Sequence, residues 1–145
     1  MRLMALVFAL VASQSLAAGW TEPQRGSATR QAMMDAIRPH AEWLLGAPVQ
    51  FVVNDLRRAG TVGYAALKAQ RPGGKPINLW DTPGYLRGEV YEGPGEAIEF
   101  HVLYRKSGDT WVAVHWSSGA TDVWFAWAPL CRQYRPVIEE FCRGL

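Results

Sequence analysis

The chain has 145 residues, of which 15 are basic and 13 are acidic, and 49% of its residues are hydrophobic. This near-balance of charge, with no basic cluster longer than Arg57-Arg58 or Arg105-Lys106, argues against a nucleic-acid-binding domain, and we expect both pairs to lie at solvated edges. The length is that of one ordinary domain, which can bury a core without metals or many disulfides.

Residues 1–18 have the pattern of a secretory signal peptide. A basic residue precedes a short apolar run that falls below the ~20 residues of a membrane helix. Ser15 and Ala17 are the small residues that a signal peptidase requires, so we expect cleavage after Ala17 or Ala18. A buried N-terminal helix is the alternative. The pattern predicts an exported chain, periplasmic or secreted, with one domain over residues 19–145 and no membrane span after cleavage.

The run SATRQAMMDAIRPHAEWLLG has the hydrophobic spacing of a helix. Ser27 is a favourable N-cap, and Gly46 stands where helices commonly end. Pro39 either kinks this helix or begins a second short one.

Two pairs of strands follow the helix. VQFVVN and TVGYAALKAQ form the first pair, with a turn at Ala59-Gly60. EAIEFHVLYRKSGDTWVAVHWSS forms the second as a hairpin, in which Gly108 suits the left-handed position of a three-residue turn. That register places Glu99 opposite His115, with His101 on the same face.

The run GATDVWFAWAPLCRQY predicts a helix that is capped at Thr121 and limited in length by Pro129. VIEEFC predicts a final helical turn. With the preceding elements this gives an α+β fold: an N-terminal helix packed on one face of a four-stranded or slightly larger antiparallel sheet, and a C-terminal helical segment.

Cys131 and Cys142 are the two cysteines of the chain. In an exported protein this even number predicts a disulfide, and free thiols are the alternative. One continuous helix would hold the two residues about 16 Å apart, which is too far for a bond. We therefore expect a turn near Tyr134 to Pro136.

Two runs, PVQFVVNDLRRAGTVGYAALKAQRPGGKPI and WVAVHWSSGATDVWFAWA, are similar to a family of small exported bacterial proteins. The resemblance implies a single exported domain and no catalytic residues. A helix laid across a curved sheet is also the architecture of the cystatin-like and NTF2-like folds, an analogy that says little about chemistry.

The segment RPGGKPINLWDTPGYLRGEVYEGPG, residues 71–95, is a first candidate binding surface. It is longer than ordinary connections, and such loops are usually functional or disordered. It is no phosphate-binding P-loop, because Pro76 follows Lys75 where a helix should begin. Aromatic and basic side chains are typical contact anchors, and the alternative is that the rings cap the sheet. The candidate residues are Lys75, Trp80, Tyr85, Arg87 and Tyr91.

An exposed sheet face is the second candidate. It would be an apolar patch rimmed by charged groups and imidazoles, as at partner or ligand surfaces. Two imidazoles and a carboxylate could also bind zinc or act as base and orienter, but the spacing matches no metal motif, so we predict no metal. The residues of this face are Glu99, His101, Arg105, Trp111 and His115.

These features predict a binding domain without catalysis or cofactor, whose partner is a protein or a small ligand in the envelope. An inhibitor or immunity-type protein is one concrete form. The alternative is a small periplasmic enzyme with a cavity between helix and sheet, using Glu99, His101 and His115.

Overall fold

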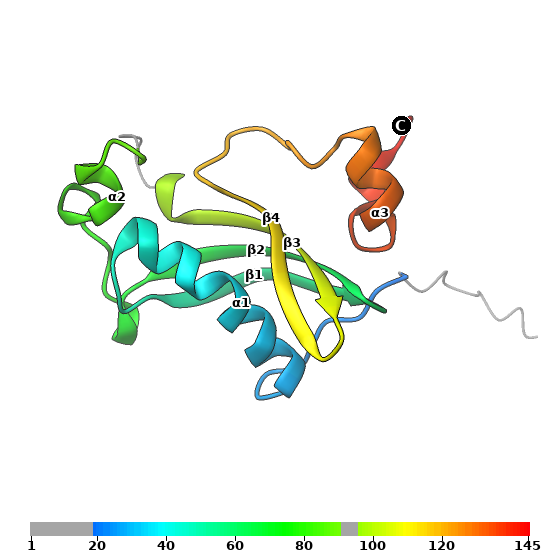
Figure 1. The fold of residues 1–145 in the computed structure, drawn as a ribbon, viewed down its shortest axis with the longest axis horizontal. Coiled ribbons are helices and arrows are strands. Elements are labelled where there is room, and N and C mark those ends of the chain that lie inside the picture. The colour runs from blue at the N-terminus through cyan, green and yellow to red at the C-terminus, as the bar shows by residue number, and fades with distance from the viewer. Residues whose placement is uncertain (1–18, 91–95) are drawn as a thin grey trace, which may run out of the picture.

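The computed structural model describes residues 19–90 and 96–145, so the predicted signal peptide and Tyr91 lie outside the described residues. Four antiparallel strands form one sheet in the order β1-β2-β3-β4. Helix α1 lies on one side of this sheet and helix α3 on the other (Figure 1). The predicted α+β class is confirmed. Within the described ranges, no helix is long and apolar enough to cross a membrane.

Helix α1 spans Ala28–Leu45 as one element that Pro39 does not interrupt. The Ser27 hydroxyl caps it by accepting a hydrogen bond of 3.2 Å from the backbone N–H of Arg30. At the other end, the Arg71 guanidinium satisfies carbonyls that the helix leaves without partners. These are the backbone carbonyls of Leu45, in the last turn, and of Gly46, the C-cap. Arg71 also donates to the carbonyl of Pro48, beyond the helix.

The strands are β1 (Gln50–Ala59), β2 (Val62–Gln70), β3 (Glu99–Ser107) and β4 (Thr110–Ser118). Each strand pairs with the next one in the chain, so the sheet is a simple meander.

The second hairpin differs from its predicted register. Its turn contains two residues, Gly108 and Asp109, because Gly108 with φ 57° takes the first turn position itself. A β-bulge beside Leu103 shifts the pairing again, so that His115 lies opposite Leu103. Glu99 instead pairs with Lys68 of β2. The predicted Glu99–His115 pair is therefore wrong.

Each face of the sheet carries its own hydrophobic core, whereas the sequence predicted cover on one face. Alternate strand residues such as Leu67, Phe100 and Tyr104 pack beneath α1. Tyr64 and Leu103 face the opposite way. They pack with buried residues of the C-terminal part, among them Phe125, Leu130, Tyr134 and Val137.

Helix α3 spans Ala128–Ile138, and a 3-10 turn over Glu139–Cys142 follows it. The predicted helix start at Thr121 is wrong, because Pro129 lies in the first turn of α3 and begins the helix rather than ending it. Residues 119–127 consequently connect β4 to α3 without a helix.

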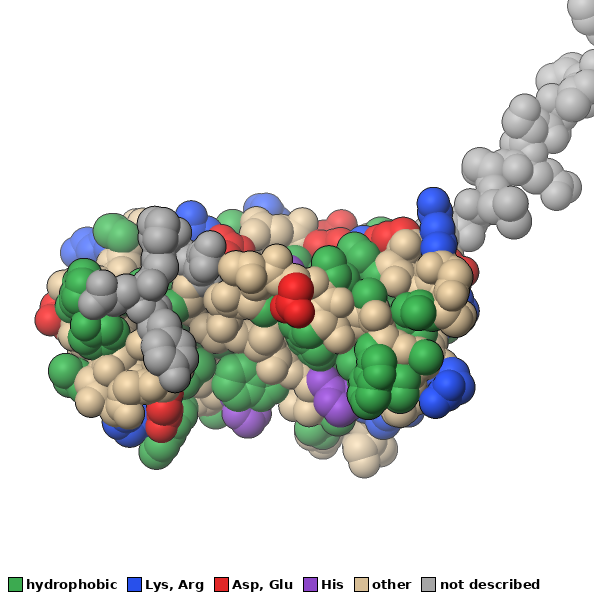
Figure 2. Space-filling view, turned by 90° about the horizontal axis from the view of Figure 1, so that it is seen from above, with side chains coloured by type: hydrophobic (Ala, Val, Ile, Leu, Met, Phe, Trp, Pro, Cys, Tyr) green, Lys and Arg blue, Asp and Glu red, His purple; other side chains and the backbone are tan. Residues whose placement is uncertain are grey.

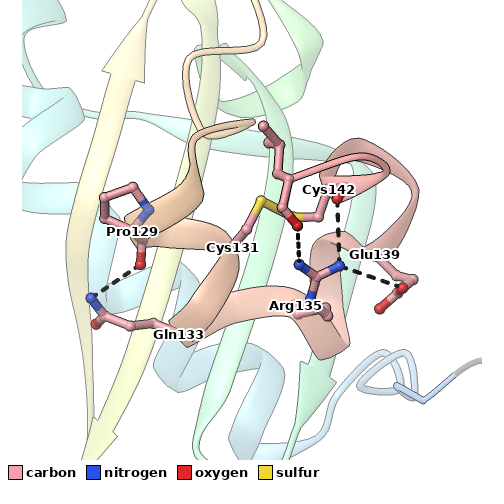
Figure 3. Close-up of a disulfide and its surroundings, with 7 residues drawn as sticks. Pro129, Cys131, Gln133, Arg135, Glu139 and Cys142 are labelled. Carbon is pink, nitrogen blue, oxygen red and sulfur yellow. Dashed lines mark hydrogen bonds and ion pairs between the residues drawn. A yellow bond between two sulfur atoms is a disulfide. The ribbon is translucent and has the colours of Figure 1, made fainter.

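The disulfide between Cys131 and Cys142 is present, with the two Cα atoms 5.7 Å apart (Figure 3). The bend that permits it lies at Ile138, after the predicted turn. The Arg135 guanidinium, which lies in α3 before the bend, donates hydrogen bonds to two backbone carbonyls beyond it. These belong to Cys142 and Leu145, at 3.4 and 3.1 Å. The disulfide and Arg135 thus hold α3 and the following turn together as one unit.

Candidate functional site

The connection between β2 and β3 is folded where the structure describes it. It contains 3-10 turns at Pro72–Gly74 and Leu79–Asp81, followed by the short helix α2 (Pro83–Leu86). Thr82 is fully buried at the joint. Its hydroxyl donates to the carbonyl of Leu79 at 2.6 Å and accepts from the backbone N–H of Tyr85 at 3.3 Å. The described part of this connection is therefore shaped by its prolines and internal hydrogen bonds, whereas the sequence predicted an irregular loop.

Helix α2 sits directly against the end of α1. A Cβ atom at Gly84 would lie 2.6 Å from the backbone oxygen of Leu44, so only glycine permits this approach. Val90 is buried beside it. The connection is thereby fixed to the helix rather than only to its own two ends.

Large hydrophobic side chains remain exposed on this folded support. The exposed fractions are 62% for Trp43, 55% for Trp80 and 75% for Leu86. The half-buried ring of Tyr85 meets Trp80 edge-on, with ring centroids 5.2 Å apart, and also packs against the α1 core. We call Trp43, Trp80, Tyr85 and Leu86 the aromatic surface.

Charged groups at the aromatic surface are paired. The Arg87 guanidinium donates to both carboxylate oxygens of Glu89 at 3.0 and 2.8 Å, and to the backbone carbonyl of Trp43 at 2.8 Å. Its central carbon lies 4.3 Å from a Trp43 ring centroid. The hydrogen bond from Arg87 lowers the pKa of Glu89. The surface therefore presents apolar rings beside an internally neutralised ion pair.

Three of the predicted loop residues thus lie at this place: Trp80, Tyr85 and Arg87. Lys75 is exposed in the turn after β2, where its backbone carbonyl accepts from the N–H of Arg71. Sequence analysis missed Trp43. A large ring outside the buried helical stripe of α1 was the available signal.

The predicted sheet face is divided by the structure. Glu99, His101, Arg105 and His115 lie on the α3 side of the sheet. Figure 2 shows hydrophobic side chains gathered toward the end of the molecule where α3 lies. Trp111 does not join them. It is 5% exposed and packs in the core under α1, because the two-residue turn places it on the opposite face.

The two histidines lie in aromatic surroundings. The His101 ring lies 6.5 Å from that of Tyr64 and 5.8 Å from that of Phe125, measured between centroids. Its Nδ1 is buried without a hydrogen-bond partner. Burial lowers the pKa of His101, and the Glu99 carboxylate opposes this effect. The His115 ring meets Tyr134 edge-on at 6.1 Å.

Glu99, His101 and His115 therefore share a face without converging on one point. Over residues 19–90 and 96–145, no group of three His, Cys, Asp or Glu side chains is arranged to hold a metal ion. Arg105, the remaining residue of the face, donates to the Gln133 side chain at 3.1 Å and lies over the Tyr134 ring. The C-terminal unit thus occupies much of the surface that was expected to be open.

Arg57 forms a polar cluster that sequence analysis missed. The sequence placed it at a solvated edge, but it is only 8% exposed. It forms ion pairs with Asp55 and Glu140, each at 2.6 Å, and donates to the carbonyl of Val137 at 3.0 Å. Its carbon also lies over the rings of Trp20 and Tyr64, 4.7 and 5.3 Å from their centroids. Asp55, two residues away on the same strand face, was the only signal in the sequence.

The described geometry makes Arg57 a structural link. Its contacts join β1, the residues before α1 and the turn after α3. Its guanidinium N–H groups bond to these neighbours within the protein. Burial raises the pKa of the neighbouring Tyr64 to about 12. A tyrosine that holds its proton this firmly is poorly suited to act as a base near neutral pH.

Comparison of the chain with protein-family models, with curated proteins and with solved structures gave no match.

Proposed function

We propose that this chain is an exported binding domain without catalysis, which holds a protein partner in the envelope through the aromatic surface. The observation that carries the proposal is the exposure of Trp43, Trp80 and Leu86 on a support fixed by buried hydrogen bonds and by the contact of Gly84 with α1. Exposed apolar groups on a rigid support lose little conformational freedom on binding.

A protein partner fits the chemistry of this surface. Trp, Tyr and Arg are the side chains that most often dominate the energy of protein interfaces. Because Arg87 and Glu89 satisfy each other, the Arg87 guanidinium is not free to bind a strongly charged ligand. The matching region of the partner would be apolar and uncharged at its centre. An inhibitor or immunity-type protein is one form of this function.

Export is supported by two features. Residues 1–18 have the composition of a signal peptide. The Cys131–Cys142 disulfide is of the kind that persists in oxidising compartments such as the periplasm or the extracellular medium.

The proposal is tested by capture of partners from an envelope extract, followed by identification of the bound proteins. The double variant Trp80→Ala/Leu86→Ala should lose a partner that the unmodified chain retains, with affinity reduced at least ~30-fold if these side chains are hot spots. Trp127→Ala is the matched control, because Trp127 is 59% exposed and lies at the start of α3. Equal capture by all three proteins would remove the aromatic surface from the function.

The alternative function is a small periplasmic enzyme that uses Glu99, His101 and His115. One observation favours it: a buried imidazole nitrogen without a partner is a feature of functional sites as well as of strained ones. Bound metal in protein purified without chelator, lost in His115→Ala, would support this alternative. A metal-free protein whose properties survive His115→Ala would exclude it.

A further inference from the structure

Residues 119–127, which we call the cover segment, lie over the α3 side of the sheet. Phe125 anchors them: it is buried, and its ring centroid lies 5.3 Å from that of Tyr64 and 5.8 Å from that of His101. Trp124 adds a second anchor, because its indole N–H donates to the Ser117 hydroxyl at 2.6 Å. Two neighbouring aromatic side chains therefore close the segment onto β2, β3 and β4.

The cover segment depends on these side-chain contacts. Gly119, directly after β4, donates its backbone N–H to the backbone carbonyl of Glu99. Among the described residues, the backbone hydrogen bonds found for residues 120–127 otherwise run within the segment or into α3, as from Ala126 to Val123. The disulfide joins α3 to the turn that follows, and the cover segment meets this unit through the edge-on contact of Phe125 with Phe141, whose ring centroids lie 5.1 Å apart. Such a segment can open without unfolding a strand or a helix.

His101 is the titratable group directly under Phe125. Its Nδ1 is enclosed and has no acceptor nearby, so a protonated imidazole would carry a second N–H donor that the closed structure leaves unsatisfied. A neutral imidazole with its proton on Nε2 leaves only an unpaired acceptor at Nδ1, which costs less to bury than a charged ring with an unpaired donor. Closure of the cover segment and protonation of His101 therefore oppose each other.

The ionisable groups around His101 do not remove this opposition. Glu99 on the same strand favours the protonated ring, but the effect of burial is larger. Lys68 of β2 lies opposite Glu99 in the sheet register. The other groups on the packed elements include Arg105 on the same face of β3, the Tyr64 phenol of β2 with Arg57 over its ring, the His115 imidazole of β4 and the exposed Asp122 of the cover segment.

We propose that the cover segment is a pH-sensitive lid, which is closed while His101 is neutral and releases Phe125 and Trp124 from the sheet when His101 becomes protonated. Opening would expose the His101 ring and the part of the Tyr64 ring that Phe125 covers, an aromatic face distinct from the aromatic surface at α2. An exported chain meets the acidity of its surroundings directly, so acid would present this second face.

The Trp124 indole N–H reports on the lid. In protein labelled with 15N-tryptophan, the quantity to measure is the protection factor of this N–H, the exchange rate of a freely exposed indole divided by that of Trp124 at the same pH. We expect it to be large at pH 7.5 and to fall as the pH drops to 5.0. The equilibrium constant for opening should rise by about tenfold for each unit of difference between the pKa of His101 in the open state and its pKa in the closed state. The indole signal of Trp80 provides the internal reference, because this ring is 55% exposed.

Two variants locate the effect. His101→Gln should keep the Trp124 protection factor independent of pH over this range, whereas His115→Gln should retain the wild-type fall in protection. The imidazole signals of His101 in the wild-type protein make the test independent of how the variants fold. If that imidazole becomes protonated while the Trp124 protection factor stays unchanged, or if His101→Gln shows the same fall in protection as wild type, the proposal is wrong.

Discussion

Replacing Arg57 with Met should destabilise the domain by roughly 3 kcal/mol. The Val137 carbonyl would lose its buried donor, a loss worth about 1–3 kcal/mol. Asp55 and Glu140 retain contact with water, with side chains 30% and 40% exposed, so each lost ion pair is expected to contribute only about 0.5–1 kcal/mol. The methionine side chain preserves part of the packing against Trp20. The expected loss of stability therefore lies near the middle of the range obtained by adding these contributions.

Urea unfolding measures this loss directly. With a slope of about 1.5–2 kcal/mol per molar urea, the midpoint should fall by roughly 1.5–2 M without a change in slope. Arg58→Met is the matched control on the same strand. The Arg58 side chain makes one exposed hydrogen bond of 3.2 Å, to Gly60, so its replacement should cost less than about 1 kcal/mol. Equal midpoints for the two variants would refute the structural role given to Arg57.

Three further outcomes follow from the packing. Reduction of the Cys131–Cys142 disulfide should lower the free energy of unfolding by about 3 kcal/mol in the chain-entropy model, measured by urea titration with and without reductant. Burial raises the pKa of Tyr64 to about 12, so the stability that its protonated phenol supplies should be complete below pH ~10. That stability, about 2 kcal/mol, should be lost as the pH rises through 12. Tyr64→Phe should show a correspondingly smaller alkaline loss of stability. Gly84→Ala should cost about 1–3 kcal/mol, because its Cβ would overlap the backbone of Leu44, and the urea midpoint checks it.

Each of these outcomes has its own contradiction. Identical midpoints in the oxidised and reduced protein would show that the closed loop does not restrict the unfolded chain. A parallel alkaline decline in wild type and Tyr64→Phe would assign the effect to other groups. Leu86→Ala is the control for Gly84→Ala, since it removes an exposed side chain from the same helix and should leave stability nearly unchanged.

Local patterns predicted the helix that begins after Ser27 and the four strands, because capping and hydrophobic alternation act over a few residues. The hairpin register was beyond such patterns. A difference of one turn residue moves every side chain of a strand to the other face, and this placed Trp111 wrongly. Pro129 was equally ambiguous, since proline both limits helices and begins them.

The candidate site divides in the same way. Trp80 and Tyr85 were identified because aromatic rings are conspicuous in a Pro/Gly-rich segment. Trp43 and Arg57 were missed because their roles depend on partners distant in the chain: Arg87 approaches one, and Glu140 the other. Residues whose neighbours come from other elements require the fold before their surroundings can be known.

The two-sided cover of the sheet has a consequence for how the chain matures. A polypeptide that emerges from its N-terminal end presents α1 and all four strands before residues 128–142 are available. During that interval α1 can already close its own core, while the opposite face still shows Tyr64 and Leu103 to the solvent. The partly folded domain thus exposes one apolar face that is prone to associate with other chains. Once α3 has packed on this face it is covered, and Glu140 then forms its ion pair with Arg57.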